Sequence, residues 1–361
     1  MQEPPTPSAW RVLRGNAAVF LGLFLALYFA IPMVDQIGKA FRALWPSIDT
    51  RGELPNYAGQ DWAKRHFAEI QLLQTDFMSY FGWRRRPFQG QTITVEPGLQ
   101  IRRTPQTTTT PGAPSVYFFG GSTLWGAGSD DARTIPALYQ GAAGGTVLNF
   151  GESGWVAHQS LNQLMKLYAE GHRPDVVVFY DGVNEVSHKC RAETDFWADD
   201  RQRQIRQALA YRPTELGYYL RPILSLAGLA AGALETRETR RNLDCDQNAA
   251  KAELIATQLI ADWQIAAALV RAHGGRFYAY LQPVSYFSQT RLQHLRLSKP
   301  MGAQYQTLYP IFRRQMAAAG IGADLSAVLD ADAPIYIDFC HISPNGNTLV
   351  AARIARDVAA R

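Results

Sequence analysis

Short apolar runs alternate with segments of helical periodicity from Ser115 onward. The runs are rich in Val, Ile, Phe and Tyr and lack alternation of apolar and polar positions, as expected for strands buried on both faces of a sheet. We predict five strands, at 116–119, 147–150, 176–180, 277–281 and 335–337. Strands that alternate with helices predict an α/β fold, here a three-layer α/β/α domain over 115–361 with a five-stranded parallel sheet.

Residues 186–249 interrupt this rhythm after the third predicted strand. An insertion of this length usually has a function or a structure of its own. Within it, residues 220–234 are apolar enough to form a helix. We expect this helix to pack on the main domain, with coverage of a pocket or contact with a membrane as the alternatives.

A different pattern lies near the start of the chain, where residues 17–34 (AAVFLGLFLALYFAIPMV) contain no charge. At about 1.5 Å per residue, a helix of this length just crosses the hydrocarbon core of a bilayer. Arg11 and Arg14 precede the stretch, while Asp35 and Lys39 follow it. This bias predicts that residues 1–16 are cytoplasmic and that everything after the anchor is periplasmic or extracellular.

Two other interpretations of residues 17–34 remain open. The stretch can be the core of a cleaved signal peptide, although it is long for one and no small-x-small site follows it cleanly. It can also be a buried helix, although it is apolar all round and lies outside the domain pattern. We favour an uncleaved, single-pass transmembrane helix in the inner (cytoplasmic) membrane.

Residues 35–114 are predicted as a juxtamembrane region that ends in a linker rich in Thr and Pro (RRTPQTTTTPGAP). The segment QTITVEPGLQIRRT alternates around Pro97 and Gly98, which predicts a short hairpin. The run of Arg84, Arg85 and Arg86 is interpreted as a solvated turn rather than as a contact for an anionic polymer.

Composition narrows the range of partners. The chain has 361 residues, of which 47% are hydrophobic, and a net charge of only +5. It has no basic tail and no stripe of interleaved basic and aromatic residues, so we expect no nucleic-acid partner. Its cysteines, Cys190, Cys245 and Cys340, lack zinc-ligand spacing, so we predict no metal and no cofactor.

Each cysteine can be a small buried apolar residue. Export of the domain would also permit a disulfide. Because Cys190 and Cys245 flank the insertion, we predict that these two residues pair and that Cys340 stays reduced.

Chemically competent residues follow the predicted strands. Ser122 comes after the first strand, Gly154 after the second, Asn184 after the third, and Asp338 and His341 after the last. Ligands of open parallel sheets bind at the carboxyl ends of the strands, so these residues should meet at one edge. Each feature alone can be a turn, a loop glycine, a helix cap or a structural pair. Their convergence predicts a site.

The residue types fit acyl transfer. A serine hydroxyl such as that of Ser122 needs a base to take its proton, and His341 can be that base. Asp338 can orient the imidazole and stabilise the imidazolium. The N–H groups of Ser122 and Gly154 and the side-chain amide of Asn184 can form an oxyanion hole.

From about residue 115 to the C-terminus, the chain resembles the SGNH/GDSL hydrolase superfamily. The motif GGST resembles the block that carries the serine, Ser122, and NFGESGW resembles the next block, with Gly154 as its glycine. DGVNE resembles the third block, with Asn184, and DFCH resembles the last, with Asp338 and His341. The resemblance implies a flavodoxin-like α/β/α fold and metal-free hydrolysis or transfer of acyl groups.

Two positions depart from the family pattern. Gly121 stands where an aspartate is usual, and Glu185 stands where an aspartate usually follows the asparagine. Neither position matches the nucleophile, the base or an oxyanion donor, so the departures bear on subfamily and substrate rather than on class.

Membrane-anchored proteins of this kind look like enzymes that edit acetyl groups on cell-envelope carbohydrate. The resemblance therefore implies a serine esterase whose substrate is an acylated carbohydrate or another acyl ester. One alternative is an O-acyltransferase that uses the same triad beside a membrane acyl-donor protein. Another is a catalytically silent polysaccharide-binding module.

Overall fold

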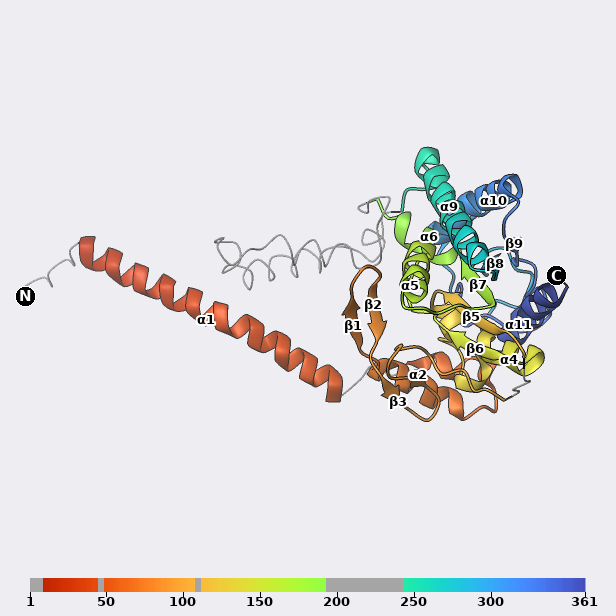
Figure 1. Ribbon diagram of the computed structural model, residues 1–361. Coiled ribbons are helices and arrows are strands. Elements are labelled where there is room, and N and C mark those ends of the chain that lie inside the picture. Colours follow the sequence, from red (N-terminus) through yellow and green to blue (C-terminus); the bar gives the residue numbers. More distant parts are fainter. Residues whose placement is uncertain (1–8, 45–48, 108–111, 193–242, 361) are drawn as a thin grey trace, which may run out of the picture. The chain divides into compact units, whose positions relative to one another are not determined.

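The computed structural model describes residues 9–44, 49–107, 112–192 and 243–360. The chain divides into two compact units, 1–47 with 203–241 and 48–202 with 242–361. The described part of the first unit is helix α1 (Ala9–Leu44), and the second unit holds the other described elements (Figure 1). The helix predicted at 220–234 lies outside the described residues.

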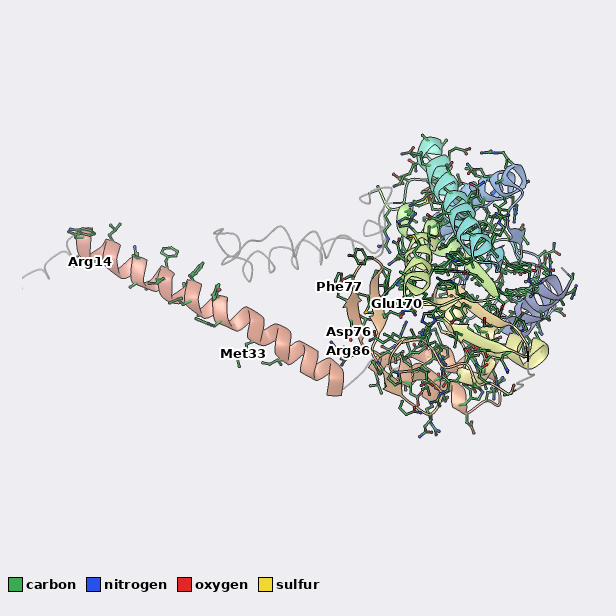
Figure 2. The ribbon with its side chains drawn as sticks, viewed as in Figure 1. Arg14, Met33, Asp76, Phe77, Arg86 and Glu170 are labelled. Atoms are coloured by element: carbon green, nitrogen blue, oxygen red, sulfur yellow. A yellow bond between two sulfur atoms is a disulfide. The ribbon has the colours of Figure 1, made fainter. Side chains whose placement is uncertain are left out.

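Helix α1 is 36 residues long and contains the whole of the uncharged stretch 17–34. Large apolar side chains along it are exposed, among them Phe20, Phe29 and Met33, the last of which is labelled in Figure 2. Exposed apolar side chains at the described positions of a helix are suited to lipid or to a protein partner rather than to water.

By length and composition alone, Ala249–Ala272 is the one described helix long and apolar enough to cross a membrane. The segment Asn16–Ala30 within α1 is apolar but shorter. Ala249–Ala272 is the domain helix α9, and Leu259, Trp263 and Val270 on it are buried in the domain core. We therefore treat α9 as a core helix and keep α1 as the candidate anchor.

The second unit is built on a parallel sheet of five strands in the order β6-β5-β7-β8-β9. The strands are β5 (Ser115–Gly120), β6 (Thr146–Asn149), β7 (Val176–Asp181), β8 (Arg276–Leu281) and β9 (Ala323–Asp324). Strand β5, which comes first in the sequence among these five, therefore lies inside the sheet, as in flavodoxin-like sheets. The five-stranded parallel sheet and four of its predicted strands are confirmed.

The strand predicted at 335–337 is wrong. Tyr336 forms only an isolated antiparallel bridge with Ile342, and Ile337 N–H donates to His341 O within the same loop. Ile335, Tyr336 and Ile337 are buried, and a short buried apolar run looks alike in a strand and in a packed loop. The fifth strand is instead β9, whose two residues carry no apolar run.

Helices cover both faces of the sheet. Alternate residues of β5 enter different cores: Tyr117 and Phe119 pack on one side, and Val116 and Phe118 on the other. The first core includes residues of α5 (Ala157–Ala169), α9 and α10 (Lys299–Ala319). The second includes residues of α4 (Ile135–Ala143) and α11 (Pro344–Ala359). The short helices between strands are α3 (Ser122–Trp125), η3 (Asp131–Arg133) and α6 (Val183–Lys189).

Residues 49–107, predicted as a juxtamembrane region, belong to the same compact unit as the sheet. Their elements are η1 (Thr50–Glu53), η2 (Pro55–Tyr57), α2 (Trp62–Leu72), β1 (Thr75–Met78), β2 (Gly82–Arg85), β3 (Phe88–Gln89) and β4 (Thr94–Val95). Strands β1 and β2 form an antiparallel hairpin. The hairpin predicted around Pro97 and Gly98 is present in short form: Val95 and Arg102 form an antiparallel bridge, with hydrogen bonds from Glu96 N–H to Ile101 O (2.8 Å) and from Arg103 N–H to Thr94 O (2.9 Å).

The cysteine prediction is confirmed. Cys190 and Cys245 form a disulfide across 55 positions, at the base of the insertion, and Cys340 is free and buried.

A buried acid lies at the end of β7. Asp181 Oδ2 accepts a hydrogen bond from Trp263 Nε1 (3.0 Å), while Oδ1 has no partner among the described residues. Burial, and then the charge of Glu185, raises the pKa of Asp181 well above its usual range. A carboxyl whose pKa is higher in the folded than in the unfolded state stabilises the fold at low pH, and this contribution is lost as the pH rises.

We therefore expect Asp181→Asn, which keeps an acceptor for Trp263, to be more stable than wild type at about pH 8 and to gain less at about pH 5. A gain of about 1 kcal/mol corresponds to roughly 2–4 °C in Tm. Asp175→Asn is the control, because hydrogen bonds from the N–H and hydroxyl of Ser115 lower the pKa of Asp175. That variant should lose stability at the higher pH. Parallel Tm–pH curves for wild type and Asp181→Asn would contradict this account.

Candidate active site

Ser122 lies at the carboxyl end of β5, at the start of α3. The residue before the turn, Gly120, faces the carbonyl oxygen of Tyr180 so closely that a side-chain Cβ would collide with it. Glycine at this position therefore lets β5 approach β7 where both strands end. The close approach brings the turn that carries Ser122 beside the turn that follows β7.

The three residues predicted as a triad form a continuous chain of hydrogen bonds. His341 Nε2 lies 2.6 Å from Ser122 Oγ, and His341 Nδ1 lies 2.6 Å from Asp338 Oδ2. The other carboxylate oxygen, Asp338 Oδ1, accepts from the N–H groups of Cys340 (2.9 Å) and His341 (2.8 Å). Asp338 is thus held by both of its oxygens.

The environment keeps Asp338 ionised. Burial by itself would raise the pKa of Asp338, but the charge of His341 and the hydrogen bonds from His341 and Cys340 lower it well below its usual range. An ionised carboxylate can only accept, so His341 Nδ1 carries the proton of that hydrogen bond. In the neutral imidazole, Nε2 is then an acceptor for the hydroxyl of Ser122. This is the tautomer that a general base requires.

A buried glutamine ties the two halves of this site together. Gln282 follows β8 and donates from Nε2 to Thr123 Oγ1 (2.8 Å) and to Cys340 O (3.3 Å). Thr123 itself donates to the same carbonyl (3.2 Å). The neighbours of Ser122 and His341 therefore share one polar network, which fixes the two loops relative to each other.

The residues predicted as oxyanion donors lie in the neighbouring loops. Asn184 is at the start of α6, and its Nδ2 donates to Trp155 O (2.6 Å). A Cβ on Gly121 would lie only 2.5 Å from that same nitrogen, so the amide sits against the backbone next to Ser122. Gly154 adopts φ +78° in the loop after β6, directly before Trp155. An amide has two hydrogens, so one remains beyond the bond to Trp155.

Both departures from the family pattern have a structural reason. Gly121 lacks a side chain because the amide of Asn184 occupies that space. Glu185 is buried, and its carboxylate accepts from Ala157 N–H (2.6 Å) and Gly182 N–H (2.9 Å). Glu185 thereby joins the start of α5 to the turn that carries Asn184.

The interpretation of Arg84 and Arg85 as part of a solvated turn is wrong. Arg84 is 1% exposed, and Arg85 pairs with Glu152 of the loop that carries Gly154. Glu152 lies 67 positions further along the chain, so no local sequence pattern could reveal this contact.

The ligand atoms of Asp338, Cys340 and His341 all lie within 4.8 Å of one another. Both ring nitrogens of His341 are engaged by Asp338 and Ser122. Burial, and then the charge of Asp338, raises the pKa of the Cys340 thiol well above its usual range, so the thiolate that a metal requires is disfavoured. The donor set fits a hydrogen-bonded triad better than a metal site.

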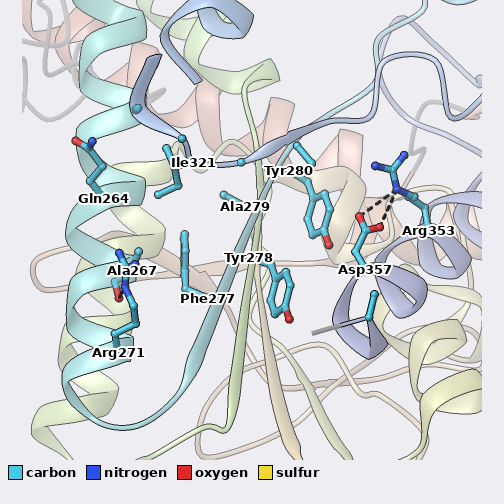
Figure 3. Close-up of a pocket in the computed structure, with 15 residues that line it drawn as sticks. Gln264, Ala267, Arg271, Phe277, Tyr278, Ala279, Tyr280, Ile321, Arg353 and Asp357 are labelled. Carbon is cyan, nitrogen blue, oxygen red and sulfur yellow. Dashed lines mark hydrogen bonds and ion pairs between the residues drawn. The ribbon is translucent and has the colours of Figure 1, made fainter. Parts of the chain in front are cut away.

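A cavity of about 570 Å³ lies elsewhere, along β8 between α9 and α11 (Figure 3). Its described lining includes Tyr278, Tyr280, Arg271 and the ion pair of Arg353 with Asp357. None of the triad residues lines it, so the cavity is separate from the candidate active site.

No family model matches the chain, and no curated protein matches it. It is similar to solved structures of a carbohydrate acetylesterase from Sinorhizobium meliloti (14% identity, 68% of this chain and 99% of that chain, TM-score 0.39) and a GDSL-like lipase from Bacteroides thetaiotaomicron (13%, 70% and 91%, 0.39). A member of the lipolytic G-D-S-L family from Veillonella parvula also matches (11%, 68% and 98%, 0.37). The TM-scores are below 0.5, so these similarities carry no conclusion about function.

The contact between Gly121 and Asn184 generates a prediction. Gly121 has φ −81°, which alanine also adopts, so Gly121→Ala changes only the space available to Asn184. We expect the amide to be displaced and kcat for an acetyl ester to fall by about 100-fold to 1,000-fold, the usual cost of losing an oxyanion donor. Gly141→Ala in α4 is the matched control, because its nearest neighbour would be 3.9 Å away. Wild-type kcat in correctly folded Gly121→Ala would refute the role of this contact.

Proposed function

We propose that this protein is a serine hydrolase that acts on acyl esters, with Ser122 as its nucleophile. The observation that carries the proposal is the unbroken hydrogen-bond chain from Asp338 through His341 to Ser122 Oγ. In this scheme His341 takes the hydroxyl proton as Ser122 attacks the ester carbonyl. The imidazolium that forms is stabilised by ionised Asp338.

Attack on the carbonyl creates an oxyanion that needs donors already in place. We assign these donors to the N–H groups of Ser122 and Gly154 and to the amide of Asn184. The bond from Asn184 Nδ2 to Trp155 O supports the assignment, because it fixes the amide before substrate arrives. His341 then gives its proton to the leaving alcohol, and water resolves the acyl-enzyme by the reverse steps.

We further propose an O-acetyl ester on cell-envelope carbohydrate as the substrate. Support comes from the motif resemblance and from α1, whose exposed apolar surface would hold the domain beside a membrane. An O-acyltransferase would use the same triad, with a sugar hydroxyl in place of water. A silent binding module would have no use for a base, an ionised acid and a nucleophile in hydrogen-bond contact.

The proposed topology places residues 1–16 in the cytoplasm and the domain outside it, because 17–34 carries no charge and Arg11 and Arg14 precede it. An alkaline phosphatase fusion at the C-terminus should therefore be active in cells. An inactive phosphatase fusion together with an active cytoplasmic reporter at the same position would overturn this topology.

The proposed chemistry predicts a graded set of variants. Ser122→Ala and His341→Ala should each lower esterase kcat by several orders of magnitude, because the triad acts as a unit. Asp338→Asn should retain more activity, since Asp338 orients and stabilises the imidazole. Asn184→Ala should still react with a fluorophosphonate probe but should turn over about 100-fold to 1,000-fold more slowly.

The assay uses purified protein and an acetyl ester, with and without an oligosaccharide acceptor, and follows free acetate and acetylated sugar. Free acetate in both mixtures supports an esterase, whereas acetylated sugar supports the transferase alternative. Circular dichroism checks the fold of each variant. Folded Ser122→Ala with wild-type turnover would show that the site is assigned wrongly.

A further inference from the structure

The loop at 150–155, between β6 and α5, is held by three consecutive side chains of β2. Trp83 donates from Nε1 to Ser153 O (3.0 Å). Arg84 donates to Phe150 O (2.9 Å) and Gly151 O (3.2 Å). We call residues 150–155 the glycine loop, because Gly154 lies in this loop. The hairpin that holds the loop begins 40 positions before β5 and lies outside the region that resembles a hydrolase.

Arg85 makes the most extensive contact with the glycine loop. Its guanidinium pairs with the carboxylate of Glu152 and donates from Nη2 to Ser153 Oγ (3.0 Å). Its backbone N–H donates to Glu152 Oε2 (2.9 Å). Glu152 is 1% exposed and also accepts from Ser153 N–H (2.8 Å). The pair therefore fixes the backbone immediately before Gly154.

Arg85 also touches the helix that carries the candidate nucleophile. Its guanidinium carbon lies 4.1 Å from the ring centre of Trp125, three residues after Ser122. The Arg85 guanidinium thus contacts both the glycine loop and the helix that begins at Ser122. These are two of the three segments that would surround an oxyanion. Arginine suits this position because it stacks on an aromatic ring while its fixed fork of donors engages a carboxylate.

Stabilisation of the fold does not by itself explain why Arg84 and Arg85 are charged residues. Arg84 is fully buried, and its hydrogen bonds go to carbonyl oxygens and to Gln163 Oε1 rather than to a carboxylate. Burial lowers the pKa of Arg84 to about 10. Well-packed apolar residues often stabilise a fold as much as buried charges do. Arginines here instead supply directed donors that set the path of the glycine loop.

The glycine loop acts on two of the proposed donors. Gly154 lies between Ser153, which Trp83 and Arg85 hold, and Trp155. Trp155 O accepts from Asn184 Nδ2 (2.6 Å), so the position of the loop also orients Asn184. A shift of the loop would therefore move a backbone donor and a side-chain donor together.

We propose that Arg85, acting through Glu152, is a positioning residue that aligns Gly154 and Asn184 for the transition state. The proposal rests on the proposed esterase function and assigns a catalytic contribution to the β1–β2 hairpin. Arg85 is not a catalytic residue in the strict sense, because it acts through the loop. Its removal should lower kcat and leave KM nearly unchanged, since oxyanion donors act mainly in the transition state.

The test compares kcat, KM and Tm for Arg85→Lys, Arg85→Ala and the double variant Arg85→Met with Glu152→Gln. Arg85→Lys keeps a buried cation but loses the fork, and the double variant removes both charges while Gln keeps an acceptor for Ser153 N–H. Each variant should lose about 100-fold in kcat, as expected when reacting groups are misplaced by about 1 Å. KM should change by less than about threefold.

Two measurements separate positioning from general stability. Arg86→Ala alters the neighbouring arginine, which is exposed and pairs with Asp76 on the same hairpin (Figure 2), and it should keep wild-type kcat. Added millimolar guanidinium should partly restore kcat in Arg85→Ala, whereas its binding to the folded state should raise Tm only slightly. Ser122→Ala, assayed in parallel, reports on the proposed function separately.

If wild type and Ser122→Ala hydrolyse the ester equally, the proposed function fails. If Ser122→Ala is inactive while folded Arg85→Lys and the double variant keep wild-type kcat, only the positioning role is overturned. A loss of kcat that tracks Tm across all variants, including Arg86→Ala, would likewise overturn it.

Discussion

The hydrogen bond between His341 and Ser122 joins residues that are 219 positions apart in the chain. It can form only if loops from different strand ends are held within a fraction of an ångström, and the rest of the domain supplies that restraint. Gly120 allows β5 and β7 to end side by side. Gln282, Thr123 and Cys340 O connect the loop of the serine with the loop of the histidine.

Buried polar groups hold several of these loops in place. Glu185 links the start of α5 to the turn of Asn184, and Glu152 links β2 to the glycine loop. Each buried polar group would cost stability if left unpaired, so each contact also specifies one arrangement of the loops. The hydrogen bonds beneath the site therefore favour one arrangement of its loops.

The sequence predicted the site better than it predicted the restraints around it. Ser122, Asn184, Asp338 and His341 could be found because each follows an apolar run, and the carboxyl ends of parallel strands share one edge. Asp338 and His341 reach the predicted edge of the sheet even though the run at 335–337 is a buried loop rather than a strand. A buried segment that ends beside the sheet is enough to place the residues that follow it at the site.

The roles of Arg84, Arg85 and the segment 49–107 could not be predicted in the same way. Their partners lie far away in the sequence, so neither periodicity nor composition carries the signal. A run of three arginines is ordinarily solvated, and only tertiary contacts distinguish the buried Arg84 from the exposed Arg86. Long-range polar pairing is thus what sequence patterns alone fail to reveal.

The central claim is that Ser122 becomes acylated. The direct measurement is rapid acid quenching of the protein with p-nitrophenyl acetate, followed by peptide mass spectrometry. One acetyl group should be found on the peptide that contains Ser122, accumulated within the first turnover and absent from His341→Ala. An acetyl group on Ser153 alone, or hydrolysis at full rate with no modified serine at any quench time, would contradict it.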